Sequence, residues 1–246
     1  MQNQGAQPVG TSDQQSAARA VREMFDSIAP RYDLLNHVLS MNVDRLWWWR
    51  TARKFRAILS RPEATILDIC CGTGDMTMAL LRYRPLAGRP VLAADFAHQM
   101  LVRGRDKFSG HNVLAIEADA LQLPLANASV DLITTAFGFR NLANYSAGLE
   151  EFHRVLRPGG QFGILDFGEP GGILGKLYAF YFRRILPAVG SRVSGVAEPY
   201  TYLPESVHRF PSPQEMQQKM RDTGFGEVSW QPYSFGIAGL YRGVKL

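Results

Sequence analysis

Cysteine is scarce in this chain of 246 residues. Only two occur, Cys70 and Cys71, and neighbouring residues cannot form an unstrained disulfide. The sequence therefore has no disulfide framework, and we expect the protein to work in a reducing, cytoplasmic compartment. With 46% hydrophobic and 20% charged residues, the composition is that of an ordinary globular protein with one large domain.

Long apolar runs are also absent. No window of the sequence holds the roughly 18 apolar residues that a membrane-spanning helix needs. Residues 1–18 are rich in Gln, Gly, Ser and Ala, which predicts a disordered tail rather than a signal or transit peptide. The net charge of +5 is mild. It would suit an anionic membrane surface or a nucleic acid, and by itself it decides between neither.

Strand and helix patterns alternate from residue 65 onward, as they do in βαβ units. The expected strands cover 65–69, 90–94, 113–117, 130–136 and 161–167, and the expected helices between them cover 75–82, 97–108 and 146–156. Two closing strands, 225–233 and 237–245, follow a final helix over 214–221. The sequence thus predicts an α/β fold with a doubly wound, mostly parallel, Rossmann-like sheet of seven strands.

Helical segments precede this core. Apolar spacing predicts a helix over 20–29, a short one over 32–39, and a longer one over 45–59 that Asp44 would cap. The longest helix contains Trp47, Trp48 and Trp49 in a row. Consecutive helical residues lie about 100° apart, so three cannot all face one core. We expect two to pack and one to be partly exposed; the alternative is a tryptophan that lines an apolar cleft or rests on a membrane.

Other segments follow the core. Residues 173–189 have the spacing of a helix, and 191–211 resemble a loop-rich insertion. We therefore treat residues 19–246 as a single domain. Its expected parts are a helical cover (19–60), a ligand-binding core (65–168), a substrate cover (170–212), and a closing helix with edge strands (213–246).

A glycine-containing turn follows the first strand of the core. The strand contains Asp68, and Gly72 and Gly74 lie in the turn before the next helix. A dinucleotide fingerprint would need a third glycine at position 77, where this chain has Thr77. The missing glycine disfavours a pyrophosphate ligand. A carboxylate at position 68 would instead suit a ligand with an ammonium group, bound directly or through water.

Two further acidic positions follow the next strands. Asp95 ends the second strand, where a carboxylate can accept hydrogen bonds from a ribose diol. Asp119 and Ala120 follow the third strand, where an acid and a backbone N–H could bind an adenine edge. Singly, Asp95 could be a helix N-cap and Asp119 could cap a turn. Together they lie at the carboxyl ends of successive strands, where open sheets bind ligands. Ammonium, ribose and adenine without phosphate indicate S-adenosylmethionine.

The segment from Cys71 to Asp75, together with Asp95 and residues 154–160, resembles the corresponding parts of class I methyltransferases. Four other segments resemble, more narrowly, the demethylmenaquinone/ubiquinone quinol C-methyltransferase family. They are 24–36 (MFDSIAPRYDLLN), 136–141 (AFGFRN), 200–206 (YTYLPES) and 241–246 (YRGVKL). The resemblance extends over roughly residues 20–246. It implies S-adenosylmethionine as methyl donor and a quinol as acceptor.

The resemblance also implies donor contacts at Thr73, at Asp95, and at the pair Asp119 and Ala120. One departure from the family pattern is visible: a serine common in relatives is Ala136 here, so only a backbone contact can remain at that position. The thiols of Cys70 and Cys71 receive no catalytic role, because nothing adjacent supplies a base.

Methyl transfer from a sulfonium is an in-line displacement that needs no metal, and the sequence has no His/Cys cluster with metal-ligand spacing. A phenol titrates near pH ~10, so a quinol hydroxyl needs a nearby cation or base to ionise at neutral pH. We expect Arg140 to stabilise the phenolate. We expect Tyr32, beside Asp33, and one of three further residues to orient the hydroxyl and take its proton. Those three are Tyr200, Tyr202 and His208. The alternatives are a structural ion pair for Arg140 and packed cover residues for the tyrosines.

The resemblance favours a polyprenylated naphthoquinol, demethylmenaquinol, as substrate, which would become menaquinol. The alternatives are a benzoquinol, another small phenolic or lipid acceptor, or a non-catalytic scaffold that only binds the donor. Arg183 and Arg184 lie among aromatic residues in 173–189, so this helix would either rest on a membrane or be an ordinary buried cover. No base-amine motif or RNA-binding segment supports a nucleic-acid partner, and the tryptophan run leaves a homodimer open.

Overall fold

The computed structural model describes residues 5–29, 42–170 and 198–246, with side chains in the last range from Tyr202 onward. Its centre is a seven-stranded sheet in the order β3-β2-β1-β4-β5-β7-β6. The strands are β1 (Ile66–Ile69), β2 (Val91–Asp95), β3 (Val113–Glu117), β4 (Val130–Ala136), β5 (Leu156–Phe167), β6 (Phe225–Tyr233) and β7 (Ala238–Lys245). β1 to β5 pair in parallel, and β7 runs antiparallel between β5 and β6. The predicted fold class is confirmed.

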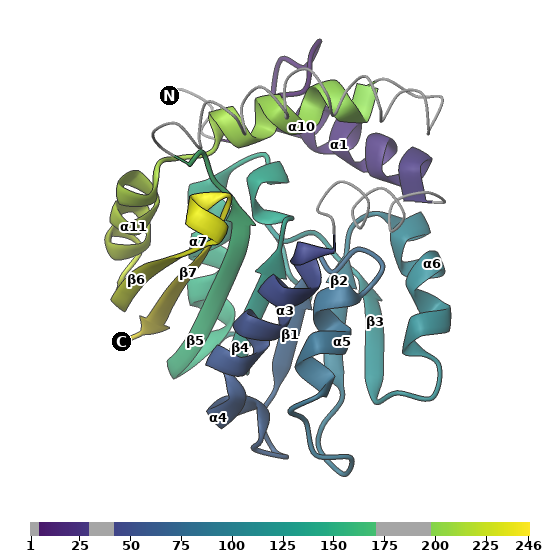
Figure 1. The fold of residues 1–246 in the computed structure, drawn as a ribbon, viewed down its shortest axis with the longest axis vertical. Helices are drawn as coiled ribbons and strands as arrows, with labels where there is room; N and C mark the ends of the chain where they lie inside the picture. Colours follow the sequence, from purple (N-terminus) through teal and green to yellow (C-terminus); the bar gives the residue numbers. More distant parts are fainter. Residues whose placement is uncertain (1–4, 30–41, 171–197) are drawn as a thin grey trace.

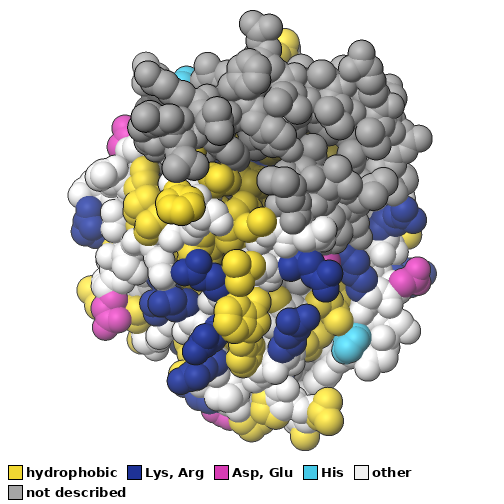
Figure 2. All heavy atoms as spheres, in the orientation of Figure 1, with side chains coloured by type: hydrophobic (Ala, Val, Ile, Leu, Met, Phe, Trp, Pro, Cys, Tyr) yellow, Lys and Arg dark blue, Asp and Glu magenta, His cyan; other side chains and the backbone are white. Residues whose placement is uncertain are grey.

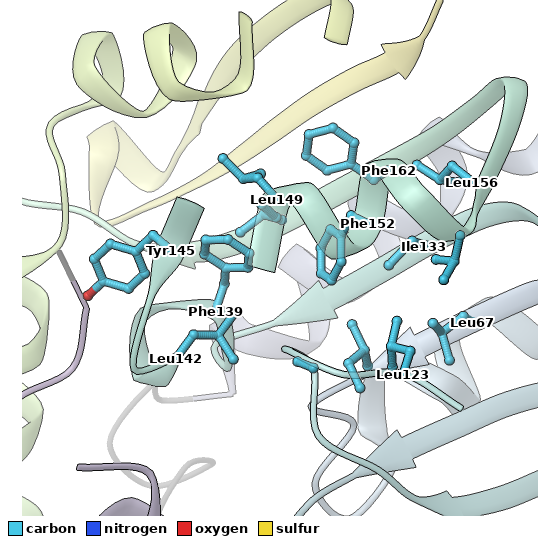
Figure 3. Packing of buried hydrophobic residues seen from close by; sticks show 14 of the residues in the cluster. Leu67, Leu123, Ile133, Phe139, Leu142, Tyr145, Leu149, Phe152, Leu156 and Phe162 are labelled. Atoms are coloured by element: carbon cyan, nitrogen blue, oxygen red, sulfur yellow. The ribbon is translucent and has the colours of Figure 1, made fainter. Parts of the chain in front are cut away.

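Apolar side chains alternate between the two faces of the sheet, as the period of two in a strand requires. Ile66 and Leu132 point to the face covered by α3 (Val43–Lys54), α4 (Arg56–Leu59) and α5 (Asp75–Leu81). Leu67 and Ile133 point to the other face, which α7 (Tyr145–Val155) and α11 (Pro213–Asp222) cover. Figure 3 shows Leu149 and Phe152 of α7 beside Phe139 in this second layer. The helices thus sandwich the sheet.

Two helices lie across the edge at which the parallel strands end. α1 (Gln14–Ile28) and α10 (Glu198–Arg209) cross this edge together (Figure 1), and Val21 of α1 shares a buried cluster with Tyr202 of α10. α1 also packs against α6 (His98–Phe108), the helix between β2 and β3. This places a helical cover over the carboxyl ends of the strands.

The predicted disordered tail is wrong for residues 5–18. Asp13 caps α1 by accepting a hydrogen bond from Ser16 N, so the helix begins six residues before the predicted Ala20. Ala6 is buried and donates its backbone N–H to Leu142 O at 2.8 Å. Small residues permit this close packing: a Cβ added at Gly5 would lie 2.1 Å from a backbone oxygen. The small residues that suggested disorder here allow the backbone to pack tightly against residues 142 and 143.

The second cover also differs from the prediction. Residues 198–209, expected in a loop-rich insertion, form α10 with Pro204 inside it. Asp44 lies in the first turn of α3 and not at its cap, which is Asn42. Trp47 and Trp48 are buried and Trp49 is partly exposed, as expected. The predicted helices 32–39 and 173–189 lie outside the described residues. Within the described residues, no helix is long and apolar enough to cross a membrane.

Candidate active site

The turn between β1 and α5 uses backbone conformations that favour glycine. Gly72 has φ 56° and Gly74 has φ 93°, a region that L side chains rarely adopt. A Cβ at Gly74 would lie 2.2 Å from the ring of Phe108 on α6, so the glycine also permits close helix packing. Cys70 adopts φ 54° as well, a strained conformation for a residue other than glycine.

A cavity lies at the carboxyl edge of the sheet, beneath α1. Five predicted donor-binding residues line it, and they come from four neighbouring strands: Gly72 after β1, Asp95 at the end of β2, Asp119 and Ala120 after β3, and Ala136 at the end of β4. The structure therefore brings these five residues together, as the parallel topology requires.

Asp95 connects the cavity wall to the glycine turn. One carboxylate oxygen accepts a hydrogen bond from Gly72 N at 2.8 Å, and the other accepts one from Ala97 N at 2.9 Å. Burial raises the pKa of this carboxyl to about 6, against the lowering effect of these backbone donors. The side chain thus fixes the position of the turn while it borders the cavity.

The polar part of the cavity is acidic. Asp119 lines it, and its carboxylate accepts a hydrogen bond from Leu121 N at 2.8 Å, which closes a local turn. Within the described ranges, no Lys or Arg side chain lines the cavity. Such a wall would repel phosphates and would suit hydroxyl, amine and ammonium groups.

Asp68 does not line the cavity, contrary to the prediction. Its side chain is fully buried below the turn, where it accepts hydrogen bonds from Thr77 Oγ1 at 2.6 Å and Thr134 Oγ1 at 2.8 Å. Burial raises the pKa of this carboxyl to about 7. Thr77, at the position of a dinucleotide-fingerprint glycine, thus supplies a hydroxyl that Asp68 needs. A direct contact from Asp68 to a bound ammonium group has no support in this geometry.

The raised pKa of Asp68 predicts a pH-dependent stability. The folded pKa, about 7, exceeds the unfolded value of about 3.9. The contribution of this group is therefore full at low pH and is lost as pH rises through 7. In urea unfolding, the wild-type free energy of unfolding should fall about 2 kcal/mol more between pH 5 and pH 8 than that of Asp68→Asn, because each pKa unit corresponds to about 1.4 kcal/mol. Parallel pH profiles would contradict this. Asp95 is common to both proteins and serves as the internal control.

Thr73 and Gly74 lie in the turn but outside the cavity wall. Thr73 is buried, and its hydroxyl accepts a hydrogen bond from Lys107 Nζ on α6 at 3.0 Å. The same ammonium group pairs with Asp75 at 2.8 Å. These contacts fasten the turn to α6, so the structure gives both residues a part in shaping the site.

Arg140 is buried in an ion pair, which is the alternative that the sequence left open. Its Nη1 lies 2.8 Å from Asp166 Oδ1, and its backbone N–H donates to Asp166 Oδ2 at 3.0 Å. The guanidinium also donates to Phe137 O and lies over the ring of Phe167 at 5.2 Å. It does not line the cavity. Because Asp166 already neutralises this cation, the geometry does not support the predicted contact with a phenolate.

The other predicted catalytic residues differ in their placement. Tyr202 is buried and donates its hydroxyl to Oδ1 of Asn141, which lines the cavity. Burial raises the pKa of Tyr202 to about 12. His208 is exposed, and its Nδ1 lies 3.1 Å from Glu169 Oε1. Tyr32 and the side chain of Tyr200 lie outside the described residues. Of the predicted catalytic residues whose side chains the structure describes, only Tyr202 contacts the cavity wall, through its hydrogen bond to Asn141.

Several cavity residues were not predicted individually, although Phe137, Gly138 and Asn141 lie in the segment 136–141 that resembles the quinol methyltransferase family. The additional lining residues are Ala18, Phe25, Cys70, Phe96, Met100, Ala118, Leu121, Phe137, Gly138, Asn141, Leu142 and Ala143. Phe25 belongs to the apolar face predicted for the first helix, so that face was the available signal. Ala18 fell in the predicted tail. Its part in the cavity depends on the early start of α1.

A model of the ubiE/COQ5 methyltransferase family matches residues 11–245. The chain belongs to this family. It is 47% identical over 242 residues to the demethylmenaquinone methyltransferase of Deinococcus radiodurans, with 97% of each chain covered. It is 43% identical to the protein of the same name from Thermus thermophilus, covering 90% of this chain and 100% of that one. A ubiquinone/menaquinone biosynthesis C-methyltransferase of Geotalea daltonii is 39% identical, covering 92% and 96%.

Solved structures agree with the fold. A SAM-dependent methyltransferase from Thermotoga maritima superposes with a TM-score of 0.62 at 18% identity, covering 92% of this chain and 100% of that one. One from Aquifex aeolicus gives 0.57 at 21% identity, covering 79% and 89%. Membership in the ubiE/COQ5 family confirms the resemblance noted in the sequence. The chain is therefore a methyltransferase whose methyl donor is S-adenosylmethionine.

Proposed function

We propose that this protein transfers a methyl group from S-adenosylmethionine to a ring carbon of demethylmenaquinol, forming menaquinol. The observation that carries the proposal is the cavity at the carboxyl edge of the sheet, with Asp95 and Asp119 in its wall and no cation of the described chain. The relative from Deinococcus radiodurans, at 47% identity over 97% of the chain, is named for the same reaction. This supports the choice of acceptor.

The residues present suit a donor with a ribose and an adenine but no phosphate. Asp95 is placed to accept hydrogen bonds from a ribose diol, since its carboxylate borders the cavity at the end of β2. Asp119 and Ala120 offer a carboxylate and a backbone edge to the adenine ring. When bound, the donor supplies a methyl group activated by a sulfonium.

The chain itself contributes positioning and the exclusion of water. Phe25 and Phe137 give the cavity apolar walls, and a dry site favours an in-line displacement. In that step a bond forms between the quinol ring carbon and the methyl group, the bond from sulfur to methyl breaks, and a thioether leaves. The ring carbon then loses its proton. Asn141 lines the cavity, and its Oδ1 accepts a hydrogen bond from Tyr202. We infer that its side chain orients a quinol hydroxyl.

The proposal includes the location and partners of the enzyme. We expect it to act in the cytoplasm at the inner face of the membrane, where a polyprenylated naphthoquinol resides. We expect it to reach this substrate through peripheral contact with the membrane. A homodimer and the absence of a nucleic-acid partner stay predictions.

An assay with labelled donor and two reduced acceptors tests the proposal. Purified protein is given a demethylnaphthoquinol or the corresponding benzoquinol, each with a short prenyl chain and kept reduced by dithionite. We expect kcat/KM for the naphthoquinol to exceed that for the benzoquinol by at least about tenfold. A hydrophobic pocket discriminates at this level between substrates that differ in a small apolar group, and the fused ring of the naphthoquinol is such a difference. Labelling of the benzoquinol alone would assign the enzyme to ubiquinone-type acceptors. Labelling of neither would refute the proposal.

A further inference from the structure

α3 presents a basic face that no described carboxylate neutralises. Its exposed residues include Arg45, Arg53 and Lys54, and Arg56 follows at the start of α4. None of these four forms an ion pair within the described part of the chain. The one acidic residue of α3, Asp44, is buried. Figure 2 shows Lys and Arg side chains gathered around a hydrophobic strip on the face of the molecule that carries α3 in Figure 1.

Apolar side chains project among these cations. Leu46 of α3 is 48% exposed, and Phe235 in the short helix η4 (Ser234–Gly236) is 82% exposed. Phe235 also has φ 60°, an unfavourable conformation for a bulky residue. The fold therefore keeps an aromatic ring in water and strains its backbone to do so. Both costs point to a role for this ring outside the folded core.

Side-chain contacts hold η4 against α3, so that the two form one surface. Trp47 Nε1 on α3 donates to Ser234 Oγ at 2.9 Å. Arg50 lies over the ring of Tyr233, 4.5 Å from its centroid. Phe235, which follows Ser234, is thereby presented beside the cations of α3. We call the exposed parts of α3, α4 and η4 the basic aromatic face.

An aromatic cluster connects this face to the cavity. The ring of Trp47 lies 5.9 Å from Phe137 and 6.2 Å from Phe167, and these two phenylalanines stack at 4.4 Å. Phe137 lines the cavity. A continuous series of rings therefore extends from the cavity wall to the base of η4.

We propose that the basic aromatic face docks on an anionic lipid bilayer and that this docking brings a lipid acceptor to the cavity. Cations around exposed apolar side chains are what an anionic interface binds, since headgroups pair with Lys and Arg while aromatic rings enter the acyl boundary. The second part rests on the proposed function, because it presumes a lipid acceptor.

Cosedimentation with large unilamellar vesicles of phosphatidylglycerol and phosphatidylcholine tests the docking. The triple variant Arg45→Gln, Lys54→Gln, Arg56→Gln should bind about a hundredfold more weakly, since each cation near an anionic surface strengthens binding about fivefold. A matched triple, Arg19→Gln, Arg105→Gln, Arg221→Gln, removes the same charge from exposed positions on α1, α6 and α11. It should retain the wild-type affinity within about threefold. Equal weakening of both triples, or of neither, would overturn the proposal.

Phe235→Asn separates docking from folding. Asparagine tolerates a positive φ, so this variant should melt at or above the wild-type temperature while its vesicle affinity falls about tenfold, the scale of burying one aromatic side chain. A lower melting temperature with unchanged vesicle binding would show that Phe235 serves the fold and would contradict the docking role.

Turnover of a short-prenyl naphthoquinol in vesicle-free buffer distinguishes the two proposals. All these variants should keep wild-type turnover there, since none of the substituted residues lines the cavity. Vesicle binding without any quinol methylation would refute the proposed function and leave the docking face standing. Methylation without vesicle binding would refute the docking face and leave the function standing.

Discussion

Asp95→Ala should weaken the binding of S-adenosylmethionine about a hundredfold or more. The carboxylate holds Gly72 N and Ala97 N in place and borders the cavity where the donor ribose is expected. A hydrogen bond to a charged group contributes about 1.5–3 kcal/mol, and each 1.4 kcal/mol is a factor of about ten in Kd. Losing the contact with the ligand together with the anchoring of the turn should therefore raise Kd by two factors of ten or more. Isothermal titration calorimetry measures the Kd.

Asp106→Ala provides the matched control for this measurement. Asp106 is an exposed carboxylate on α6, away from the cavity wall. Its replacement removes the same charge and should leave the Kd unchanged. If Asp95→Ala, with a native circular dichroism spectrum, bound the donor within about threefold of the wild-type Kd, Asp95 would have to be removed from the donor site.

Asp166→Asn should destabilise the fold by about 3 kcal/mol or more. The substitution leaves the guanidinium of Arg140 buried beside a neutral amide, and breaking a buried pair by removing one charge is expensive. Adding Arg140→Gln removes the stranded charge while an amide–amide hydrogen bond remains available. The double variant should recover at least half of the lost free energy of unfolding. Urea titrations of both variants give these values.

Turnover in the double variant decides what Arg140 does. If Arg140 positions the segment after β4 through Asp166 and Phe137 O, naphthoquinol turnover should recover along with stability, to within about tenfold of wild type. If Arg140 stabilises a phenolate directly, the double variant should fold and bind the donor but remain inactive, because an amide cannot replace the cation. The geometry favours the first outcome, and the second would restore the hypothesis drawn from the sequence.

The sheet and the donor edge could be predicted because their signals are local. An apolar run, two glycines and an acid at the end of each strand fall within a few residues of one another, and the parallel topology then brings Gly72, Asp95 and Asp119 together without further information. The seven strands followed from the same short patterns. Here the sequence interpretation and the structure agree within a few residues at most element ends.

The partners of buried charges could not be predicted, because they come from distant parts of the chain. Arg140 and Asp166 are 26 residues apart and meet because β4 and β5 pair in register. Asp68 is satisfied by Thr134, which lies 66 residues away on β4. From sequence alone, Arg140 and Asp68 both looked available for a ligand. Only the strand register shows that other side chains of the protein already pair with these two groups.

The cover over the site was misjudged for a different reason. Residues 5–18 have a composition typical of disorder, yet Asp13 and Ser16 form a reciprocal cap and Ala17 is fully buried. α10, where a loop-rich insertion was expected, contains Pro204, a residue that disfavours the interior of a helix. At both places tertiary packing overrides the local conformational preference of the sequence. Both helices are stabilised by their contacts with each other and with the sheet edge that they cover.

The bond formed in the labelled-donor assay tests the central claim most directly. Purified protein is incubated with a donor that carries a trideuterated methyl group and with a reduced short-prenyl demethylnaphthoquinol, and the product is analysed by NMR and mass spectrometry. We expect a new carbon-bound CD3 group on the quinone ring of the oxidised product. At donor concentrations below the wild-type Kd, the Asp95→Ala variant should form it about a hundredfold more slowly. A CD3 group on oxygen, or no transfer to the naphthoquinol, would contradict the account.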